Sequence, residues 1–307
     1  MPISILTIFE KDYHFGLAAL LNSLIRFGYT GTFWAFFRGE LPGWVAEHPL
    51  YDRESLRIDS PDGIRIQFAE IDAEIHPAYL KPALMLDVLH RLDTSSDAVV
   101  YMDPDIVLTY RWGLLANWVS SGGVSLFEDV NPNMPPRHPY RLAWIEIFQH
   151  WGAADLRDLS RYYNSGFVGI TRTEAGFLDE WKRLCAIPPE EIRREADRVG
   201  WTPERWDQDR LNYALMTTKV EINTTGPDGM GFVMGNNLLA HATGSAKPWR
   251  GGYIQRAVMS GRAPSFAQKE YLKVAGGPFR AESSLRLALQ RTAARSAAAI
   301  GRFYRRS

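Results

Sequence analysis

The chain has 307 residues, of which 46% are hydrophobic, enough for one large α/β domain or two small ones. Its 35 basic and 35 acidic residues cancel, which argues against general nucleic-acid binding. The chain has a single cysteine, Cys185, so it cannot form an internal disulfide, as is usual for proteins of the reducing cytoplasm. We expect Cys185 to be a buried apolar core residue. No charged leader with an apolar segment opens the chain and no run of 18 apolar residues occurs, so we expect a cytoplasmic protein without a membrane span.

Strands and helices alternate through the first hundred residues. Segments rich in β-branched and aromatic residues predict strands, and apolar residues at helical spacing predict the helices between them. The expected strands are residues 3–9, 32–37, 64–71 and 98–102, and the expected helices are residues 15–27 and 79–92. This alternation predicts a mostly parallel sheet with helices on both faces, in which ligands bind beyond the carboxyl ends of the strands.

Two carboxylates, Asp103 and Asp105, follow the short buried strand at residues 98–102. Two oxygen donors held side by side repel each other unless a cation or protons neutralise them, so the pair indicates a divalent metal. A solvated acidic turn is the alternative interpretation, because Asp is a common turn residue. After the first strand, Asp12 fits either a helix N-cap or a ligand contact.

The middle of the chain is less regular than the first hundred residues. Residues 131–139 hold four prolines and predict a surface loop, either an acceptor-binding segment or a plain connector. A strand is expected at residues 162–170, with a polar break at Asn164-Ser165-Gly166 where glycine indicates either close backbone approach or a bulge. Aromatic-rich residues 141–151 and charged residues 188–198 predict helices, and Asp207-Gln208-Asp209 begins another helix, where capping is the simplest role for an Asp.

An imidazole, a glycine and a lysine recur at every third position in the segment from His241 to Trp249. His241 can complete a metal site begun by Asp103 and Asp105, and Lys247 can reach the oxygens of a diphosphate. Gly244 allows the backbone to approach such a ligand. A purely structural role for His241 is the alternative.

Taken together, these motifs resemble the GT-A fold glycosyltransferases, in particular glycosyltransferase family 8, over residues 3 to 250. The matching pieces occur in the family's order and are Asp12-Tyr13 with Gly16, Leu20, Ser23 and Leu24; Tyr79 with Lys81; Asp103 and Asp105; Asn164-Ser165-Gly166; Asp207-Gln208-Asp209 with Leu211-Asn212; and His241 to Trp249. Two positions depart from the family pattern: Glu10 stands in place of an Asp, and Pro104 separates the two metal carboxylates. Neither removes a metal ligand.

The resemblance implies a role for each matching position. Asp103, Asp105 and His241 would hold Mn²⁺, or Mg²⁺, on a nucleotide-diphosphate sugar, with UDP the expected nucleotide. The nucleotide and diphosphate would be bound by Thr7, Asp12, Tyr13, Lys81, Asp103, Gly244 and Lys247. The donor sugar would be lined by Asn164, Asp207 and Gln208, with Gln208 beneath the anomeric carbon.

The implied reaction is retaining transfer of a hexose to a saccharide, lipid-linked saccharide or protein acceptor, in polysaccharide or lipopolysaccharide synthesis. The expected organisation is a catalytic domain over residues 1–260, divided at residue 110 into nucleotide and sugar halves, and an extension over residues 261–307. A sugar-nucleotide pyrophosphorylase is a rival, although residues 8–14 lack the glycines of its phosphate loop. A non-catalytic carbohydrate-binding protein of the same fold is the other.

The extension is strongly basic, with ten Lys or Arg and two Glu, a net charge of +8. Within it, apolar residues from Leu285 to Tyr304 fall on one side of a helical wheel and arginines on the other. Such a helix over residues 281–307 suits an anionic membrane surface, and a helix docked on the domain or a disordered tail are the alternatives. The ten tryptophans suggest a stacking platform for acceptor sugars, although most should be core residues. The candidates are Trp112, Trp118, Trp144, Trp151 and Trp206.

Overall fold

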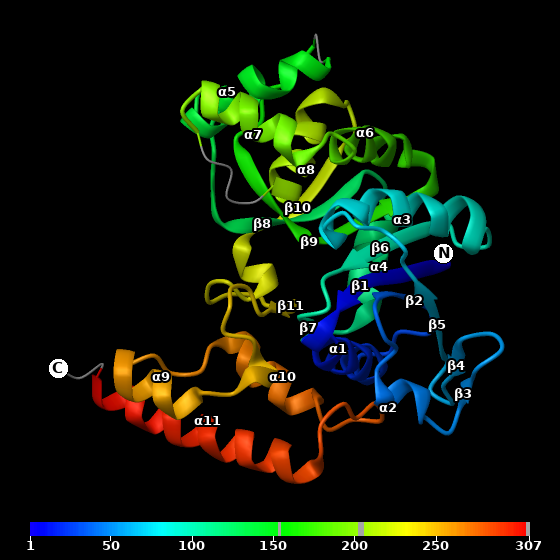
Figure 1. Cartoon of the computed structure of the whole chain (residues 1–307), viewed down its shortest axis with the longest axis vertical. Helices are drawn as coiled ribbons and strands as arrows, with labels where there is room; N and C mark the ends of the chain where they lie inside the picture. The colour runs from blue at the N-terminus through cyan, green and yellow to red at the C-terminus, as the bar shows by residue number, and fades with distance from the viewer. Residues whose placement is uncertain (153–154, 202–205, 305–307) are drawn as a thin grey trace. The chain divides into compact units, whose positions relative to one another are not determined.

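The computed structural model describes residues 1–152, 155–201 and 206–304, with secondary structure as drawn in Figure 1. Its internal contacts divide the chain into two compact units. The first comprises residues 1–8, 72–102 and 115–227, and the second comprises residues 9–71, 103–114 and 228–307. Each unit is therefore assembled from three segments that are separated in the sequence. The sequence-based division at residue 110 into a nucleotide half and a sugar half follows a different boundary.

The first unit is built on strands in the order β10, β8, β9, β6 and β1. β6 runs parallel to β1, with Val100 opposite Ile5, whereas β9 runs antiparallel between β6 and β8. All five residues of β6 are buried, as expected for a central strand. The bounds are β1 (Ile3–Glu10), β6 (Ala98–Met102), β8 (Val124–Asn133), β9 (Arg161–Thr171) and β10 (Ile222–Thr225).

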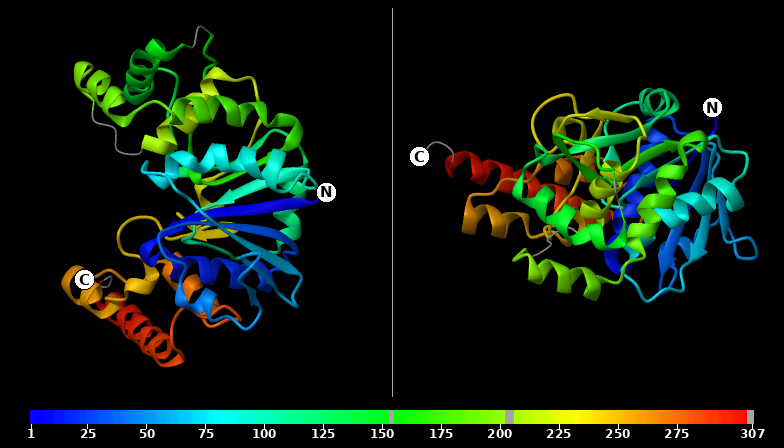
Figure 2. Two further views of the ribbon diagram at one scale, coloured as in Figure 1. Left: turned by 45° about the vertical axis from the view of Figure 1, so that its right-hand side comes forward. Right: turned by 90° about the horizontal axis from the view of Figure 1, so that it is seen from above.

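Helices pack together beside these strands in the first unit. α6 packs against both α3 and α8, and α5 contacts α7 and α8 (Figures 1 and 2). The bounds are α3 (Lys81–Asp87) continued by a π-helical turn (Val88–Leu92), α4 (Trp112–Ser120), α5 (Pro139–Phe148), α6 (Gly176–Cys185), α7 (Pro189–Arg198) and α8 (Trp206–Thr217). Short 3₁₀ turns cover Pro77–Leu80, Gln149–Trp151 and Arg172–Glu174.

The second unit contains strands in the order β2, β5, β4 and β3, and a separate antiparallel pair of β7 with β11. β2 and β5 are parallel, and Phe33 lies opposite Ile66. The bounds are β2 (Gly31–Arg38), β3 (Tyr51–Asp52), β4 (Arg57–Asp59), β5 (Ile64–Glu70), β7 (Ile106–Leu108), β11 (Leu239–His241), α1 (His14–Arg26), α2 (Gly43–Ala46), α9 (Tyr253–Ser260), α10 (Phe266–Val274) and α11 (Ser284–Tyr304). Further 3₁₀ turns cover Lys11–Tyr13, Pro227–Met230 and Pro248–Arg250.

The α/β fold class is confirmed. Every strand and helix predicted in the first hundred residues is present, and Gly28 follows α1 with a φ of +84°, as a glycine after a helix end should. Residues 131–139 are a loop only in part, because β8 extends to Asn133 and α5 begins at Pro139. Cys185 is buried, and burial raises the pKa of its thiol to about 12, which leaves it inert.

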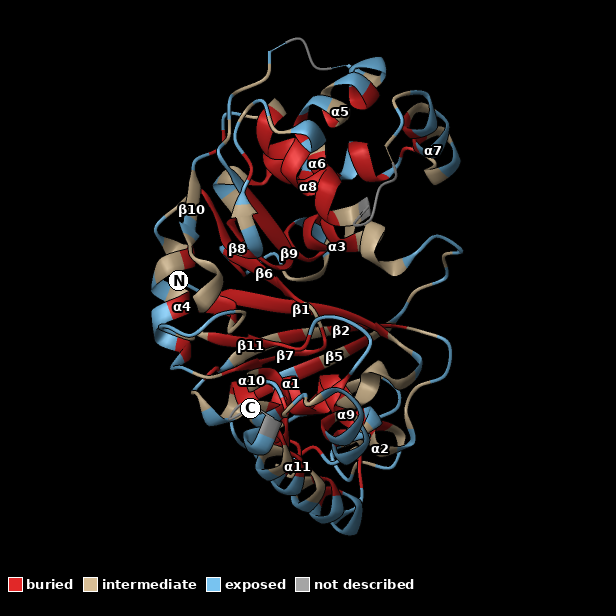
Figure 3. Cartoon of the chain, turned by 90° about the vertical axis from the view of Figure 1, so that its left-hand side faces the viewer, coloured by how far each residue is buried: buried red, intermediate tan, exposed pale blue. Residues whose placement is uncertain are grey.

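The C-terminal extension is a docked helix in the second unit. α11 packs against α9 and α10, and it buries Leu287, Gln290, Ala294 and Ala297 (Figure 3). The wheel at 100° per residue placed Leu285, Leu289 and Phe303 on the apolar side, but their exposed fractions are 71%, 62% and 77%. The small side chains of Ala294 and Ala297 on the buried face allow the helices to approach closely. Tyr304 and the arginines at 305 and 306, part of the predicted wheel, have side chains outside the described residues.

The side chain of Asn22 in α1 is hydrogen-bonded to the extension. The Asn22 amide donates to the carbonyl oxygens of Val274 and Phe279, at 3.0 and 2.8 Å, and its oxygen accepts from the Phe279 amide at 2.9 Å.

Among the described helices, none is long and apolar enough to cross a membrane.

Candidate active site

The two carboxylates and the distant imidazole meet in the second unit. The turn at Asp103 and Asp105 leads directly into β7, and His241 is the last residue of β11. These strands pair so that His241 lies opposite Ile106. The imidazole Nε2 is therefore 3.6 Å from Asp103 Oδ2 and 3.2 Å from Asp105 Oδ1. The sequence prediction that these three side chains come together is confirmed.

The three donors fit a divalent cation. One ligand atom from each side chain lies within 4.8 Å of the others, and two carboxylates with one imidazole form a donor set that suits Mn²⁺. The other imidazole nitrogen, Nδ1 of His241, is buried and makes no hydrogen bond with the described residues. The strand pairing and the ring of Phe232, with its centroid 5.7 Å away, hold the imidazole in place.

Lys247 belongs to the same cluster. Its Nζ lies 2.5 Å from Asp105 Oδ2 and 2.8 Å from the carbonyl oxygen of Ala242, and it sits 5.3 Å from the centroid of the Tyr13 ring. Burial alone would raise the pKa of Asp105, but the positive charges and hydrogen bonds of His241 and Lys247 outweigh it and hold that pKa well below its usual range. Asp105 is therefore a carboxylate over the whole neutral range.

Asp12 lies inside the 3₁₀ turn Lys11–Tyr13 and is therefore not a helix N-cap, and its role as a ligand contact stays a prediction. Its carboxylate accepts hydrogen bonds from Trp249 Nε1 at 2.9 Å and from Arg250 Nε and Nη2 at 2.7 and 3.0 Å. These hydrogen bonds, chiefly those of Arg250, lower the pKa of Asp12. Trp249 is buried with its ring 5.4 Å from that of Tyr13, so the pair anchors the segment after Gly244. Arg250 was not predicted, although it directly follows the Lys-Pro-Trp motif.

Gly16 of α1 sits against the carboxylate turn. A Cβ atom at this position would lie 2.2 Å from the Pro104 carbonyl oxygen and 2.9 Å from Cζ3 of Trp249. The helix can therefore approach the turn between Asp103 and Asp105 only because the residue is glycine. Gly244, in contrast, has a φ of +78° and an open position without neighbouring atoms within 4 Å of a built Cβ.

Replacing Gly16 with Ala is expected to lower Mn²⁺ affinity by at least about tenfold and to destabilise the chain by about 1–3 kcal/mol, since the added methyl group must displace the turn. Calorimetric titration with Mn²⁺ and thermal unfolding measure the two effects. Gly113→Ala is the matched control, because a Cβ there meets nothing within 4 Å. Wild-type affinity in Gly16→Ala would show that the turn does not position the ligands.

A second polar cluster lies in the first unit, where α8 begins beside β9. Lys81, at the start of α3, is buried, and its Nζ is 3.0 Å from Asp207 Oδ2, 3.2 Å from the Ser165 carbonyl oxygen and 4.7 Å from the centroid of the Tyr101 ring. The Ser165 hydroxyl donates to the same Asp207 oxygen at 2.8 Å. Burial raises the pKa of Asp207, but the Lys81 ammonium outweighs this and lowers it overall.

Gln208 is held from both ends of its amide. Nε2 donates to Asp129 Oδ2 at 2.7 Å, and Oε1 accepts from the Ser165 amide at 3.2 Å. Asn164 Oδ1 accepts from the Gly166 amide at 2.8 Å, which stabilises the predicted bulge where the register between β8 and β9 shifts. Asp129 was not predicted, because it lies within β8 and belongs to no motif.

The remaining predicted contact residue, Thr7, is fully buried. Its hydroxyl donates to the Met102 carbonyl oxygen at 2.7 Å, so in this structure it links β1 to the end of β6. Of the suggested tryptophans, Trp144 and Trp112 are core residues, and Trp118 stacks on Phe167 and meets Phe127 edge-on. Trp151 is partly buried against Phe148, and the side chain of Trp206 lies outside the described residues.

Neither the family models nor the curated proteins gave a match to this chain. Solved structures of glycosyltransferases did. GlyE from Streptococcus pneumoniae TIGR4 is 13% identical with a TM-score of 0.53, over 97% of this chain and 64% of that one. The WbbM bifunctional glycosyltransferase is 13% identical with a TM-score of 0.52, over 94% of this chain and 51% of that one. The galactosyltransferase LgtC, solved with donor and acceptor sugar analogues, is 15% identical with a TM-score of 0.53, over 89% and 95%.

These similarities establish the fold. The chain has the GT-A fold of glycosyltransferases, as the motifs predicted. It spans 64% of the GlyE chain and 51% of the WbbM chain.

Proposed function

We propose that this protein is a metal-dependent, retaining glycosyltransferase that moves a hexose from a nucleotide-diphosphate sugar, with UDP as the nucleotide, to a hydroxyl of a saccharide or glycolipid. One observation carries the proposal. In a GT-A fold, the turn before β7 brings Asp103 and Asp105 next to His241 at the end of β11. Lys247 contacts the Asp105 carboxylate.

The chain's own residues account for the chemistry. Asp103, Asp105 and His241 would hold Mn²⁺, which when bound neutralises charge on the departing diphosphate. Lys247 would add a mobile ammonium to those oxygens once released from Asp105, and the open backbone at Gly244 would let the loop come close to them. Asp207 would orient the sugar hydroxyls, and Gln208, fixed by Asp129 and Ser165, would lie beneath the anomeric carbon.

The test is a thermal-shift panel of UDP-, GDP- and CDP-sugars with Mn²⁺ or Mg²⁺, followed by a hydrolysis assay on the hit. A donor at about 100 times its Kd should stabilise the chain by about 2.7 kcal/mol. We expect stabilisation that requires the metal, and slow release of the sugar to water. Stabilisation without hydrolysis or transfer would favour a non-catalytic carbohydrate-binding protein, and the absence of both would refute the proposal.

We also propose that α11 contacts an anionic membrane surface, which would bring the enzyme to a lipid-linked acceptor. Leu285, Leu289 and Phe303 project from the docked helix, and Arg295 and Arg302 are exposed along it. Apolar side chains with neighbouring cations suit the headgroup region.

Exchanging Leu285, Leu289 and Phe303 for Ser is expected to reduce co-sedimentation with anionic liposomes at least about tenfold. Each of these exposed side chains would contribute about 1.5–3 kcal/mol to binding when it is buried in the bilayer. Substitution is preferable to deletion, since removing α11 would uncover the core around Ala297. The exchange Leu50→Ser, at another exposed leucine of the second unit, is the control. Equal recovery of all three proteins in the supernatant would exclude membrane contact.

A further inference from the structure

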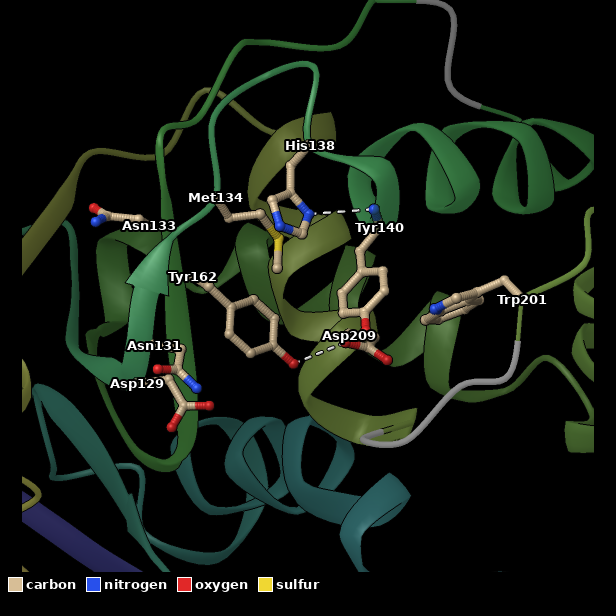
Figure 4. A pocket seen from close by; sticks show the side chains of 9 residues that line it. All are labelled: Asp129, Asn131, Asn133, Met134, His138, Tyr140, Tyr162, Trp201 and Asp209. Carbon is tan, nitrogen blue, oxygen red and sulfur yellow. Dashed lines mark hydrogen bonds between the residues drawn. The ribbon is translucent and has the colours of Figure 1, made fainter.

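A pocket of about 240 Å³ opens in the first unit, between the end of β8, the start of α5 and the start of α8 (Figure 4). This volume lies just below the roughly 300 Å³ at which small-molecule sites usually begin, so it suits one small ring. The mechanism described above uses none of its aromatic residues.

The pocket has an aromatic side. Tyr140, at the beginning of α5, keeps 45% of its surface exposed, and its ring centroid lies 6.0 Å from that of the half-buried Trp201. Figure 4 shows both rings on the same side of the pocket. Aromatic surface left exposed at the rim of a pocket provides contact area for the apolar face of a ligand ring.

The pocket also has a polar floor. Asp129 and Asp209 are 3% and 6% exposed, and the Tyr162 hydroxyl donates to Asp209 Oδ1 at 2.8 Å. The amide side chains of Asn131 and Asn133 lie at its edge (Figure 4). Carboxylates accept short, charge-assisted hydrogen bonds from hydroxyl groups. A ligand with one apolar face and several hydroxyls, a pyranose ring, satisfies both sides.

Asp129 connects this pocket to the proposed reaction centre, because it also accepts the hydrogen bond from Gln208 Nε2 at 2.7 Å. We infer that the pocket binds a neutral pyranose of the acceptor, with Tyr140 and Trp201 stacking on the ring and Asp129 and Asp209 accepting from its hydroxyls. This inference rests on the proposed transferase function. The two carboxylates would repel an acidic sugar, so uronic and sialic acids are excluded.

The test uses the full chain with Trp201→Ala and Tyr140→Ala. Leu142→Ala is the matched control, because this leucine is 50% exposed on the same helix, α5, but does not line the pocket. Binding to a printed array of neutral and sialylated oligosaccharides is measured together with hydrolysis of the donor sugar nucleotide in the absence of acceptor. We expect wild type and Leu142→Ala to bind neutral glycans, and each aromatic variant to lose about tenfold in affinity.

Donor hydrolysis should stay within about twofold of wild type in all three variants, because water replaces the acceptor. Glycan binding unchanged in both aromatic variants, no binding of neutral glycans by wild type, or a preference for sialylated glycans would overturn the inference. Glycan binding that depends on Trp201 and Tyr140 in a chain that hydrolyses no sugar nucleotide would uphold the pocket and refute the transferase function, so the two failures are distinct.

Discussion

Replacing Asp105 with Asn is expected to reduce sugar transfer by at least about a thousandfold, the size of effect seen when a main electrostatic contact to the transition state is lost. The Asp105 carboxylate contacts both His241 and Lys247. Its loss would weaken the metal site and release Lys247 together. Initial rates at saturating Mn²⁺ and donor measure the effect.

Stability must be measured beside activity in this variant. Lys247 and Asp105 keep only 7% and 5% of their side-chain surface exposed, so leaving the ammonium without its partner should cost about 3–5 kcal/mol. The variant Asp103→Asn separates the two effects, since Lys247 forms its ion pair with Asp105 and the Asp103 side chain is 23% exposed, against 5% for Asp105. We expect Asp103→Asn to lose about as much activity as Asp105→Asn but to be destabilised less. Near-normal turnover in Asp103→Asn would contradict a role for the carboxylate pair.

Exchange of Asp207 for Ala is expected to destabilise the chain by about 3 kcal/mol and to slow transfer more than Gln208→Ala does. The energy lies at the lower end of the range for a buried ion pair, because Asp207 keeps 22% of its side-chain surface exposed while Lys81 keeps 4%. Gln208 is neutral, so its removal breaks no ion pair, although the buried Asp129 carboxylate loses one hydrogen bond. Urea unfolding and steady-state kinetics of both variants measure the difference.

The double variant Lys81→Met with Asp207→Ala is the control for the ion pair. Its loss of stability should be smaller than the sum of the two single losses, because no unpaired charge remains. Since the folded pKa of Asp207 lies below its ordinary value of 3.8, the stability that Asp207 contributes is fully present above that pH. This contribution is lost as pH falls through the lower folded pKa. If the double variant at pH 7 loses as much stability as the two single variants together, Lys81 and Asp207 are not coupled.

The sequence determines the strands and helices of the first hundred residues and the two carboxylates of the metal site. The hydrophobic periodicity of β1, α1 and β6 is strong, and Asp103 and Asp105 follow a buried strand, so both the elements and the carboxylates were predictable. The meeting with His241 was predicted through resemblance and residue chemistry. The pairing of β7 with β11 that produces it involves three residues on each strand, too few to show a periodic pattern.

Other features depend on tertiary contacts that periodicity does not contain. Asp129 and Arg250 belong to no motif, and only the folded chain brings them to Gln208 and Asp12. The buried face of α11 is set by close approach at small residues, as at Gly301, where a Cβ would lie 2.9 Å from that of Ala263. A hydrophobic wheel gives such residues little weight and therefore favours Leu285 and Leu289.

The central claim is that Asp103, Asp105 and His241 hold one divalent cation. Titration with Mn²⁺, alone and with UDP, followed by the electron paramagnetic resonance signal of free Mn²⁺, tests it most directly. We expect one ion bound per chain in the wild type, and affinity reduced by at least about tenfold in Asp103→Asn and in His241→Ala. Absence of binding by the wild type under both conditions, or equal binding by both variants, would contradict the claim.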